Sequence, residues 1–359
     1  MKQNKKAQIE LQFKWIFVLI AGGLILFFFF SVIGGQKDAS ETKLHTDLTN
    51  QFELIFAGQG VATGTKNQID IPPLPLQFGC NDYAIGNQAR TFGNAIIFAP
   101  AIINTNKMLT LTRAWQVPFK VTNMIYVSAP NIKYYFVNFN DELQPVINDS
   151  LLLGMDSEFV TTDEYTDLVY EKNPQVKFIF NGLPPAGFPE TFIGLRGDQV
   201  RGLQLDKVIQ SPDEFDGRVA FTFLRKQNLD AGWENDEEGA QGTYPSLKFE
   251  TFLGAVVSGN AELYQCNIRR ALLRMKFVAS VYDKKLELLY ADRNFHCAVN
   301  PDECCDTFLA TEFKDLAGDD IIPKSGLLEI SQVGEFMSRQ NSLTGRNNNA
   351  MRGSCPTLY

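Results

Sequence analysis

Histidine is scarce in this chain, which has only His45 and His296 among its 359 residues. The chain therefore has few residues with which to build a metal centre or a catalytic triad that depends on imidazole. The sequence also lacks a Gly-x-Ser-x-Gly elbow, a His-Glu-x-x-His helix, a Cys-x-x-Cys pair and a dinucleotide-binding glycine pattern after a strand. Only a pair of carboxylates of the glycosidase type stays open among the common catalytic arrangements. The sequence thus favours no particular enzyme.

The composition excludes two other classes of chain. Apolar residues make up 45% and charged residues 21%, so the chain is not intrinsically disordered. Gly 27 and Pro 16 are ordinary shares, which excludes a collagen-like or low-complexity sequence. The length is typical of about two domains.

A run of 21 residues, 15–35, contains no charged side chain. As a helix it extends roughly 31 Å, the thickness of the hydrocarbon core of a bilayer. Four lysines precede this run and no excess of cations follows it, which places the N-terminus in the cytoplasm. We therefore predict a cell-membrane protein with a cytoplasmic segment 1–14, a transmembrane helix 15–35 in contact with the lipid bilayer, and the rest of the chain outside.

The part of the chain that follows this run is acidic. The first 35 residues have a net charge of +3, from four lysines against Glu10, and the whole chain has −8, which leaves −11 on the remainder. A surface of this sign repels phosphate backbones. We expect no nucleic-acid partner.

All cysteines lie on the predicted outer side, and their number is even, which favours disulfides. The short loop between Cys297 and Cys304 closes at the lowest cost in chain entropy, and an Asn-Pro turn brings its ends together. By elimination we pair Cys266 with Cys305 and Cys80 with Cys355.

The same region admits a metal site as an alternative. His296, Cys297, Cys304 and Cys305 are ligand types for zinc, but six residues separate Cys297 from Cys304 where paired zinc ligands usually have two to four. We therefore predict no metal and no cofactor.

Residues 36–58 follow the apolar run and predict an amphipathic stalk helix. Leu44, Leu48, Phe52 and Ile55 recur at steps of four, four and three, which places them on one face. Such a face offers a surface for self-association or for a protein partner. The main ectodomain then extends over residues 59–337, with room for two subdomains, and a polar tail over residues 338–359.

The ectodomain predicts an α/β fold with a mixed β-sheet and covering helices, with α+β as the alternative. Short segments rich in Val, Ile, Phe and Tyr predict strands at 95–98, 119–127, 132–139, 176–180, 219–224 and 247–252. Helices are expected at 141–153, 163–170 and, most strongly, 262–283. The order of strand, helix and strand favours parallel pairing.

The opposite face of the helix expected at 262–283 is basic, with Arg269, Arg270, Arg274 and Lys276. A solvated helix face explains this pattern most simply. An acidic partner or a membrane surface is the alternative.

The N-terminus, Lys5-Lys6-Ala7-Gln8-Ile9-Glu10 before an apolar helix, resembles the prepilin-type signal of archaeal type IV pilin-like proteins. The resemblance covers about residues 5–35. It implies cleavage after Ala7, with the apolar helix retained on the mature chain. More broadly, the chain is similar to single-pass archaeal surface proteins without an assigned activity.

We therefore expect a membrane-anchored extracytoplasmic protein with a structural or binding role and an unknown ligand. A pilin-like filament subunit is one alternative, because it needs the same apolar N-terminal helix. A membrane-tethered hydrolase is the other, because carboxylates are plentiful in the ectodomain.

Overall fold

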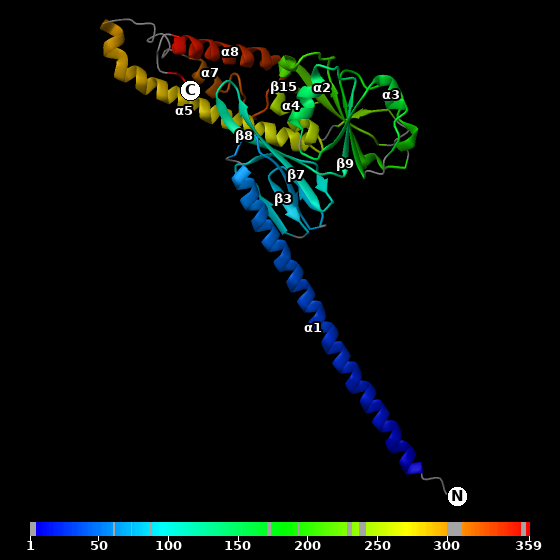
Figure 1. Cartoon of the computed structure of the whole chain (residues 1–359). Helices are drawn as coiled ribbons and strands as arrows, with labels where there is room; N and C mark the ends of the chain where they lie inside the picture. The colour runs from blue at the N-terminus through cyan, green and yellow to red at the C-terminus, as the bar shows by residue number, and fades with distance from the viewer. Residues whose placement is uncertain are drawn as a thin grey trace. The chain divides into compact units, whose positions relative to one another are not determined.

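The computed structural model describes residues 5–59, 62–72, 74–86, 88–151, 153–170, 174–192, 194–227, 232–236, 242–299, 311–352 and 357–359, with the side chains of 5–16, 34–42, 44, 45, 47 and 289–299 left out. The chain divides into two compact units, residues 1–52 and residues 53–359. Figure 1 shows the order of the helices and strands.

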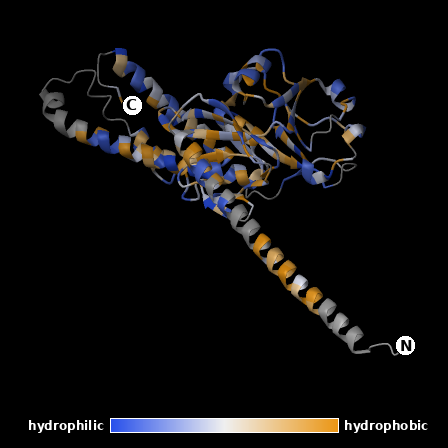
Figure 2. Ribbon diagram, turned by 60° about the horizontal axis from the view of Figure 1, so that its bottom comes forward, coloured by the Kyte–Doolittle hydropathy of each residue, from blue (hydrophilic) through white to orange (hydrophobic). Residues whose placement is uncertain are grey.

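Most of the first unit belongs to one helix, α1 (Lys5–Gln59), which continues without interruption through the predicted stalk. Large apolar side chains over residues 17–33 are exposed, for example Leu19 at 75% and Phe27 at 74%, and the ribbon of Figure 2 shows this part of the helix mostly in the colour of hydrophobic residues.

The predicted transmembrane helix at 15–35 is wrong by the measure the structure provides. No helix in the part of the chain that the structure describes is both long enough and apolar enough to cross a membrane.

The second unit is a mixed α/β structure with three sheets. The first has the order β1-β7-β8-β5, in which β5 is parallel to β8 and the other pairs are antiparallel. These strands are β1 (Lys66–Asp70), β5 (Ile96–Phe98), β7 (Lys107–Gln116) and β8 (Lys120–Ser128). A smaller antiparallel sheet, β4-β3-β2-β6, consists of β2 (Leu76–Phe78), β3 (Asp82–Ile85), β4 (Gln88–Thr91) and β6 (Ile102–Ile103).

The largest sheet has seven strands and a parallel half. Its parallel strands, in spatial order, are β10 (Asp156–Val160), β9 (Ile132–Val137), β11 (Gln175–Phe180) and β12 (Val200–Leu205). The antiparallel strands β13 (Asp216–Arg225), β14 (Glu234–Asn235) and β15 (Tyr244–Leu247) complete it.

Alternation along β11 separates the two faces of this sheet. Phe178 and Phe180 lie on the face with a large aromatic cluster that includes Tyr165 of α3 (Thr162–Thr166). Lys177 lies on the opposite face, where α4 (Phe249–Val257) and α5 (Ala261–Val299) pack. Tyr264 of α5 joins the two larger sheets, because its ring contacts Phe98 of β5 and Phe223 of β13.

The described part of the second unit contains further α-helices before and after those that pack on the large sheet. Helix α2 (Leu143–Ser150) connects β9 to β10, and α7 (Glu312–Ala317) and α8 (Ile330–Arg352) follow α5. The strand predicted at 247–252 is wrong, because β15 ends at Leu247 and α4 begins two residues later. The polar tail predicted from residue 338 is helical as far as Arg352, and Phe336 and Leu343 of this helix are buried.

The basic face of α5 binds within the chain. Arg270 donates to the backbone oxygen of Ala95 and to the side chain of Asn81, and Arg274 donates to the backbone oxygen of Asn94. Lys276 pairs with Asp319. These contacts fix loops of the second unit against α5, so an acidic partner is not needed to explain the charges.

One disulfide joins Cys80, in the turn between β2 and β3, to Cys266 of α5. The expectation of disulfides is thus confirmed for this pair, but the predicted pairs Cys80–Cys355 and Cys266–Cys305 are wrong. The pairing by elimination was wrong because the sequence contains no information on the distances between the cysteines. In the structure, the turn of residues 79–82 lies beside α5, and Arg270 of α5 also binds this turn through Asn81.

Candidate functional site

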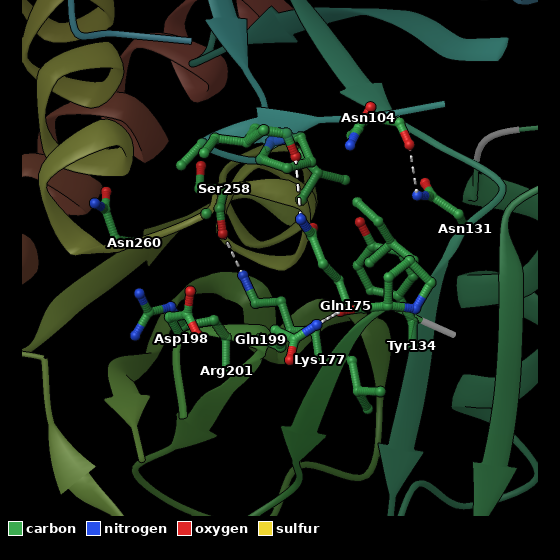
Figure 3. A pocket seen from close by; sticks show the side chains of 18 of the residues that line it. Asn104, Asn131, Tyr134, Gln175, Lys177, Asp198, Gln199, Arg201, Ser258 and Asn260 are labelled. Atoms are coloured by element: carbon green, nitrogen blue, oxygen red, sulfur yellow. Dashed lines mark hydrogen bonds between the residues drawn. The ribbon is translucent and has the colours of Figure 1, made fainter. Parts of the chain in front are cut away.

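A pocket of about 390 Å³ lies at the amino ends of the parallel strands, where the chain passes from α4 to α5. Its walls come from β9, β11 and β12, from the segment after β5 that includes β6 (Pro100, Ala101, Ile102 and Asn104), and from residues 257–260. Figure 3 shows polar side chains of these segments around it. The size suits a small organic molecule.

Lys177 lies at the base of the pocket and is only 5% exposed. Its Nζ donates to the backbone oxygens of Ala255 (2.7 Å) and Ser258 (2.5 Å), which are free carbonyls at the end of α4. Burial, and to a smaller extent the charge of Arg201, lower the pKa of Lys177 to about 7, against an opposing effect of Asp236. The amine therefore has a structural task, the closing of a helix end.

Arg201 is the neighbour of Lys177 across the ladder of β11 and β12, on the same face of the sheet. Its guanidinium lines the pocket and is partly buried. Among the residues that the structure describes, it forms neither a hydrogen bond nor an ion pair. A partly desolvated guanidinium without a counter-charge favours an anion, because its planar fork matches a carboxylate or a phosphate.

The remaining charges lie at the rim. Arg196 binds Asp198 in a bidentate pair with two distances of 3.1 Å, and both side chains are largely exposed. This pair neutralises itself. The ionic character of the pocket is therefore set by Lys177 and Arg201, in a chain whose net charge is −8.

Neutral amides fix the walls. Gln175 donates to the backbone oxygen of Ile102 (3.3 Å), and Asn131 donates to that of Asn104 (3.3 Å), so the loop after β5 is tied to β9 and β11. Asn260 caps α5 by accepting from the backbone N–H of Leu263 at 2.9 Å. Figure 3 labels these side chains around the pocket, with Gln175 on β11, Asn131 just before β9 and Asn260 at the α4–α5 junction.

The arrangement suits binding better than catalysis. Lys177 has the perturbed pKa that is typical of a reactive amine, but two carbonyls already accept its protons. No histidine, and no pair of carboxylates, lines the pocket in the described part of the chain. The glycosidase-type pair of carboxylates that the sequence left open therefore has no support at this site.

The cysteines and the histidine singled out in the sequence lie elsewhere. Cys80 and Cys266 form the disulfide, whereas the side chains of His296, Cys297, Cys304, Cys305 and Cys355 lie outside the described residues. The proposed pair Cys297–Cys304 and the alternative zinc cluster stay predictions. Within the described residues, no group of three or more His, Cys, Asp or Glu side chains could hold a metal ion.

The sequence analysis did not identify Lys177 or Arg201 as site residues, although the sequence contains an indication for Lys177. Lys177 is the only charged residue within a strand that is otherwise apolar after its first residue. A charged residue in a strand with both faces buried needs a local partner or a ligand. Arg201 gives no such signal, because its strand also contains the polar Gln204 and includes partly buried positions.

Comparisons of this chain with protein-family models, with curated proteins and with solved structures found no match.

Proposed function

We propose that this protein is an extracytoplasmic binding protein that takes up a small organic anion in the pocket between β11, β12 and the α4–α5 junction. The observation that supports this most directly is the partly buried guanidinium of Arg201, which has no partner among the described residues. A carboxylate or a phosphate group of the ligand supplies the missing charge.

The lining supports a ligand with an apolar or hydroxylated body attached to the anionic group. Ile102, Ile132 and Val257 offer apolar contacts, and Asn104 and Asn260 offer amides. The pocket volume of about 390 Å³ limits the ligand to a small molecule.

The disulfide supports the location. Cys80 and Cys266 are 186 residues apart and joined in the folded unit. Structural disulfides persist mainly in oxidising compartments. We therefore place the folded unit outside the cytoplasm.

The test measures binding of small anions to the full chain by isothermal titration. The probes are succinate, citrate, benzoate and inorganic phosphate, with glycerol as the uncharged control. We expect saturable binding of at least one anion and none of glycerol. Binding of phosphate without binding of the carboxylates would indicate a phosphate site, and the reverse result would indicate a carboxylate site.

Variants assign the binding to Arg201. Arg201→Gln should weaken it roughly 10- to 100-fold, the usual effect of a lost hydrogen bond to a charged group. Arg218→Gln is the matched control, because Arg218 is exposed on the neighbouring strand β13 and lies outside the pocket. Failure of every anion to bind, or equal weakening by both variants, would contradict the proposal.

A filament subunit is the second candidate, and the exposed apolar side chains of residues 17–33 favour it. Exposed apolar surface of this extent needs a cover, and copies of the same helix supply one. Mass spectrometry of the native N-terminus tests it: a mature chain that begins at Gln8 supports the filament, and an intact start contradicts it.

A further inference from the structure

A second crevice, of about 360 Å³, lies at the carboxyl ends of the same parallel strands. Strands β9 and β11 are adjacent, but the chain leaves β9 through α2 toward β10 on one side and leaves β11 toward β12 on the other. The loops therefore diverge and open a crevice between these strand ends. In open α/β sheets, ligands bind at such a switch of direction.

The crevice is distinct from the anion pocket. The pocket is lined by residues 132, 175–177, 199 and 201 at the amino ends of β9, β11 and β12, and the crevice by residues 138, 160 and 181 at the carboxyl ends of β9, β10 and β11. A strand of six residues such as β11 separates the two by roughly 20 Å. One ligand of small size cannot fill both.

Asn181 shapes the crevice in advance. Its side-chain amide donates to the backbone oxygens of Asn138 (3.1 Å) and Ile209 (2.9 Å) and accepts from the backbone N–H of Ile209 (2.8 Å). It is 3% exposed. The loops after β9, β11 and β12 are thus held together by one buried residue, and a ligand meets a formed site.

The lining is almost free of charge. Glu164 is the one ionisable side chain among the described lining residues, and its carboxylate already accepts from the N–H (2.8 Å) and the Oγ1 (3.0 Å) of Thr161. The polar lining residues are otherwise neutral: Asn138, Asn140, Gln144, Thr161, Asn181 and Gln210. This chemistry suits a ligand that offers many hydroxyl groups and no charge.

Asn138 is the polar residue best placed to bind. It follows β9 directly, its backbone has φ 65, and it is exposed. Its side-chain amide forms no hydrogen bond with the described residues, whereas its backbone N–H and oxygen bind Val160 and Asn181. A left-handed conformation at a residue other than glycine is uncommon and is found at functional sites.

Phe159 adds an apolar surface. Its ring is partly buried, lines the crevice and stacks on Phe136 at 5.0 Å. A ring fixed in this way offers a flat face to the C–H groups of a sugar ring. We propose that the crevice binds a neutral saccharide unit, with the ring against Phe159 and hydroxyl groups bonded to the amide of Asn138.

The experiment titrates the full chain with glucose, galactose, mannose, N-acetylglucosamine and maltose, followed by saturation-transfer NMR, with glucuronate as the charged comparison. We expect saturable binding of a neutral sugar and weaker binding of glucuronate. Absence of saturable binding by every neutral sugar overturns the proposal.

Two variants place the binding in the crevice. Asn138→Gly removes the amide and keeps the left-handed backbone, because glycine accepts this φ, and should weaken binding about tenfold. Val208→Trp fills the crevice and should abolish binding, because Val208 lines it and is 54% exposed. Leu183→Trp is the control, since Leu183 is 84% exposed and lies outside the crevice.

Arg201→Gln should leave sugar binding unchanged, and Asn138→Gly should leave anion binding unchanged. The failure of one proposal is therefore distinguishable from the failure of the other. Circular dichroism of each variant confirms the fold. Undiminished sugar binding in both Asn138→Gly and Val208→Trp contradicts the assignment to this crevice.

Discussion

Lys177 and Arg201 are direct neighbours across the parallel ladder of β11 and β12, so two cations share one face of a buried sheet. Arg225 of β13 continues the row as the partner of Arg201. Lys177 is stabilised by two carbonyls of the α4 end. Since Arg201 has no such partner among the described residues, the row attracts an anion at the point where the pocket opens.

The pH dependence of the free energy of unfolding should show that the pKa of Lys177 is lowered in the folded protein. Burial, followed by the charge of Arg201, lowers the pKa of Lys177 to about 7 in the folded state, against 10.5 for the free side chain. Between these values the unfolded chain binds one more proton, so this group makes the free energy of unfolding rise with pH by about 1.4 kcal/mol per unit.

Urea unfolding of the wild type and of Lys177→Met at pH 7 to 9.5 measures this effect. We expect the rise to disappear in the variant. This range lies below the titration of tyrosine, whose buried members have raised pKa values. Equal slopes for the two proteins would show that Lys177 keeps an ordinary pKa.

Loss of the disulfide should cost the second unit about 5 kcal/mol, because Cys80 and Cys266 are separated by 186 positions and close a long loop. The double variant Cys80→Ser/Cys266→Ser measures it by urea unfolding. Peptide mapping without reduction should recover the two cysteines in one cross-linked fragment. A fragment that joins Cys80 to Cys355 would refute the pairing.

Two arginines of α8 should differ in their effect on stability. Arg346 binds Glu312 of α7 at 2.9 Å, and the side chain of Glu312 is only 6% exposed. Arg346→Met should cost about 3 kcal/mol, because a buried carboxylate loses its partner. Arg339→Met, which breaks exposed pairs with Asp315 and Glu335, should cost less than about 1 kcal/mol.

Acid should weaken the same contact. Burial alone would raise the pKa of Glu312, but hydrogen bonds from Ser342 and Arg346 outweigh burial and lower it. The contribution of Glu312 is therefore complete above pH ~4.5 and is lost as the pH falls through the lowered pKa. The difference in thermal unfolding between the wild type and Arg346→Met should therefore start to shrink as the pH falls below about 4.5.

Glycine-to-alanine changes in two helices should have opposite signs. A Cβ on Gly254 of α4 would lie 3.0 Å from ring carbons of Phe98, so Gly254→Ala should cost about 1–3 kcal/mol through overpacking. A Cβ on Gly334 of α8 meets nothing within 4 Å, so Gly334→Ala should stabilise by about 0.5–1 kcal/mol. Thermal unfolding measures both.

The sequence pattern predicted some of the buried elements and missed others. The apolar runs at 132–139 and 176–180 correspond to β9 and β11, and the helix expected at 262–283 corresponds to the first part of α5. In these elements, the order of apolar and polar residues in the sequence follows from which positions are buried. Strands β7 and β12 were not predicted, although most of their residues are buried. Strands β1 and β4 were missed because they are largely exposed and polar, so hydropathy gives them no signal.

The binding sites depend on register, which sequence alone does not contain. Lys177 and Arg201 are 24 positions apart and become neighbours only through the pairing of β11 with β12. Asn138 and Asn181 meet because β9 and β11 are adjacent although β10 lies between them in the chain. A single sequence offers candidates for such positions, but no rule that joins them.

The bond between Cys80 and Cys266 also sets an order of events during biosynthesis. At a synthesis rate of about 5–20 residues per second, the second cysteine follows the first by roughly 10–40 s. Throughout this interval the bond cannot form, and the chain contains no other cysteine before Cys266 with which Cys80 could pair. The bond therefore forms only after the strands β3 to β15, which lie between the two cysteines in the chain, have all been synthesised.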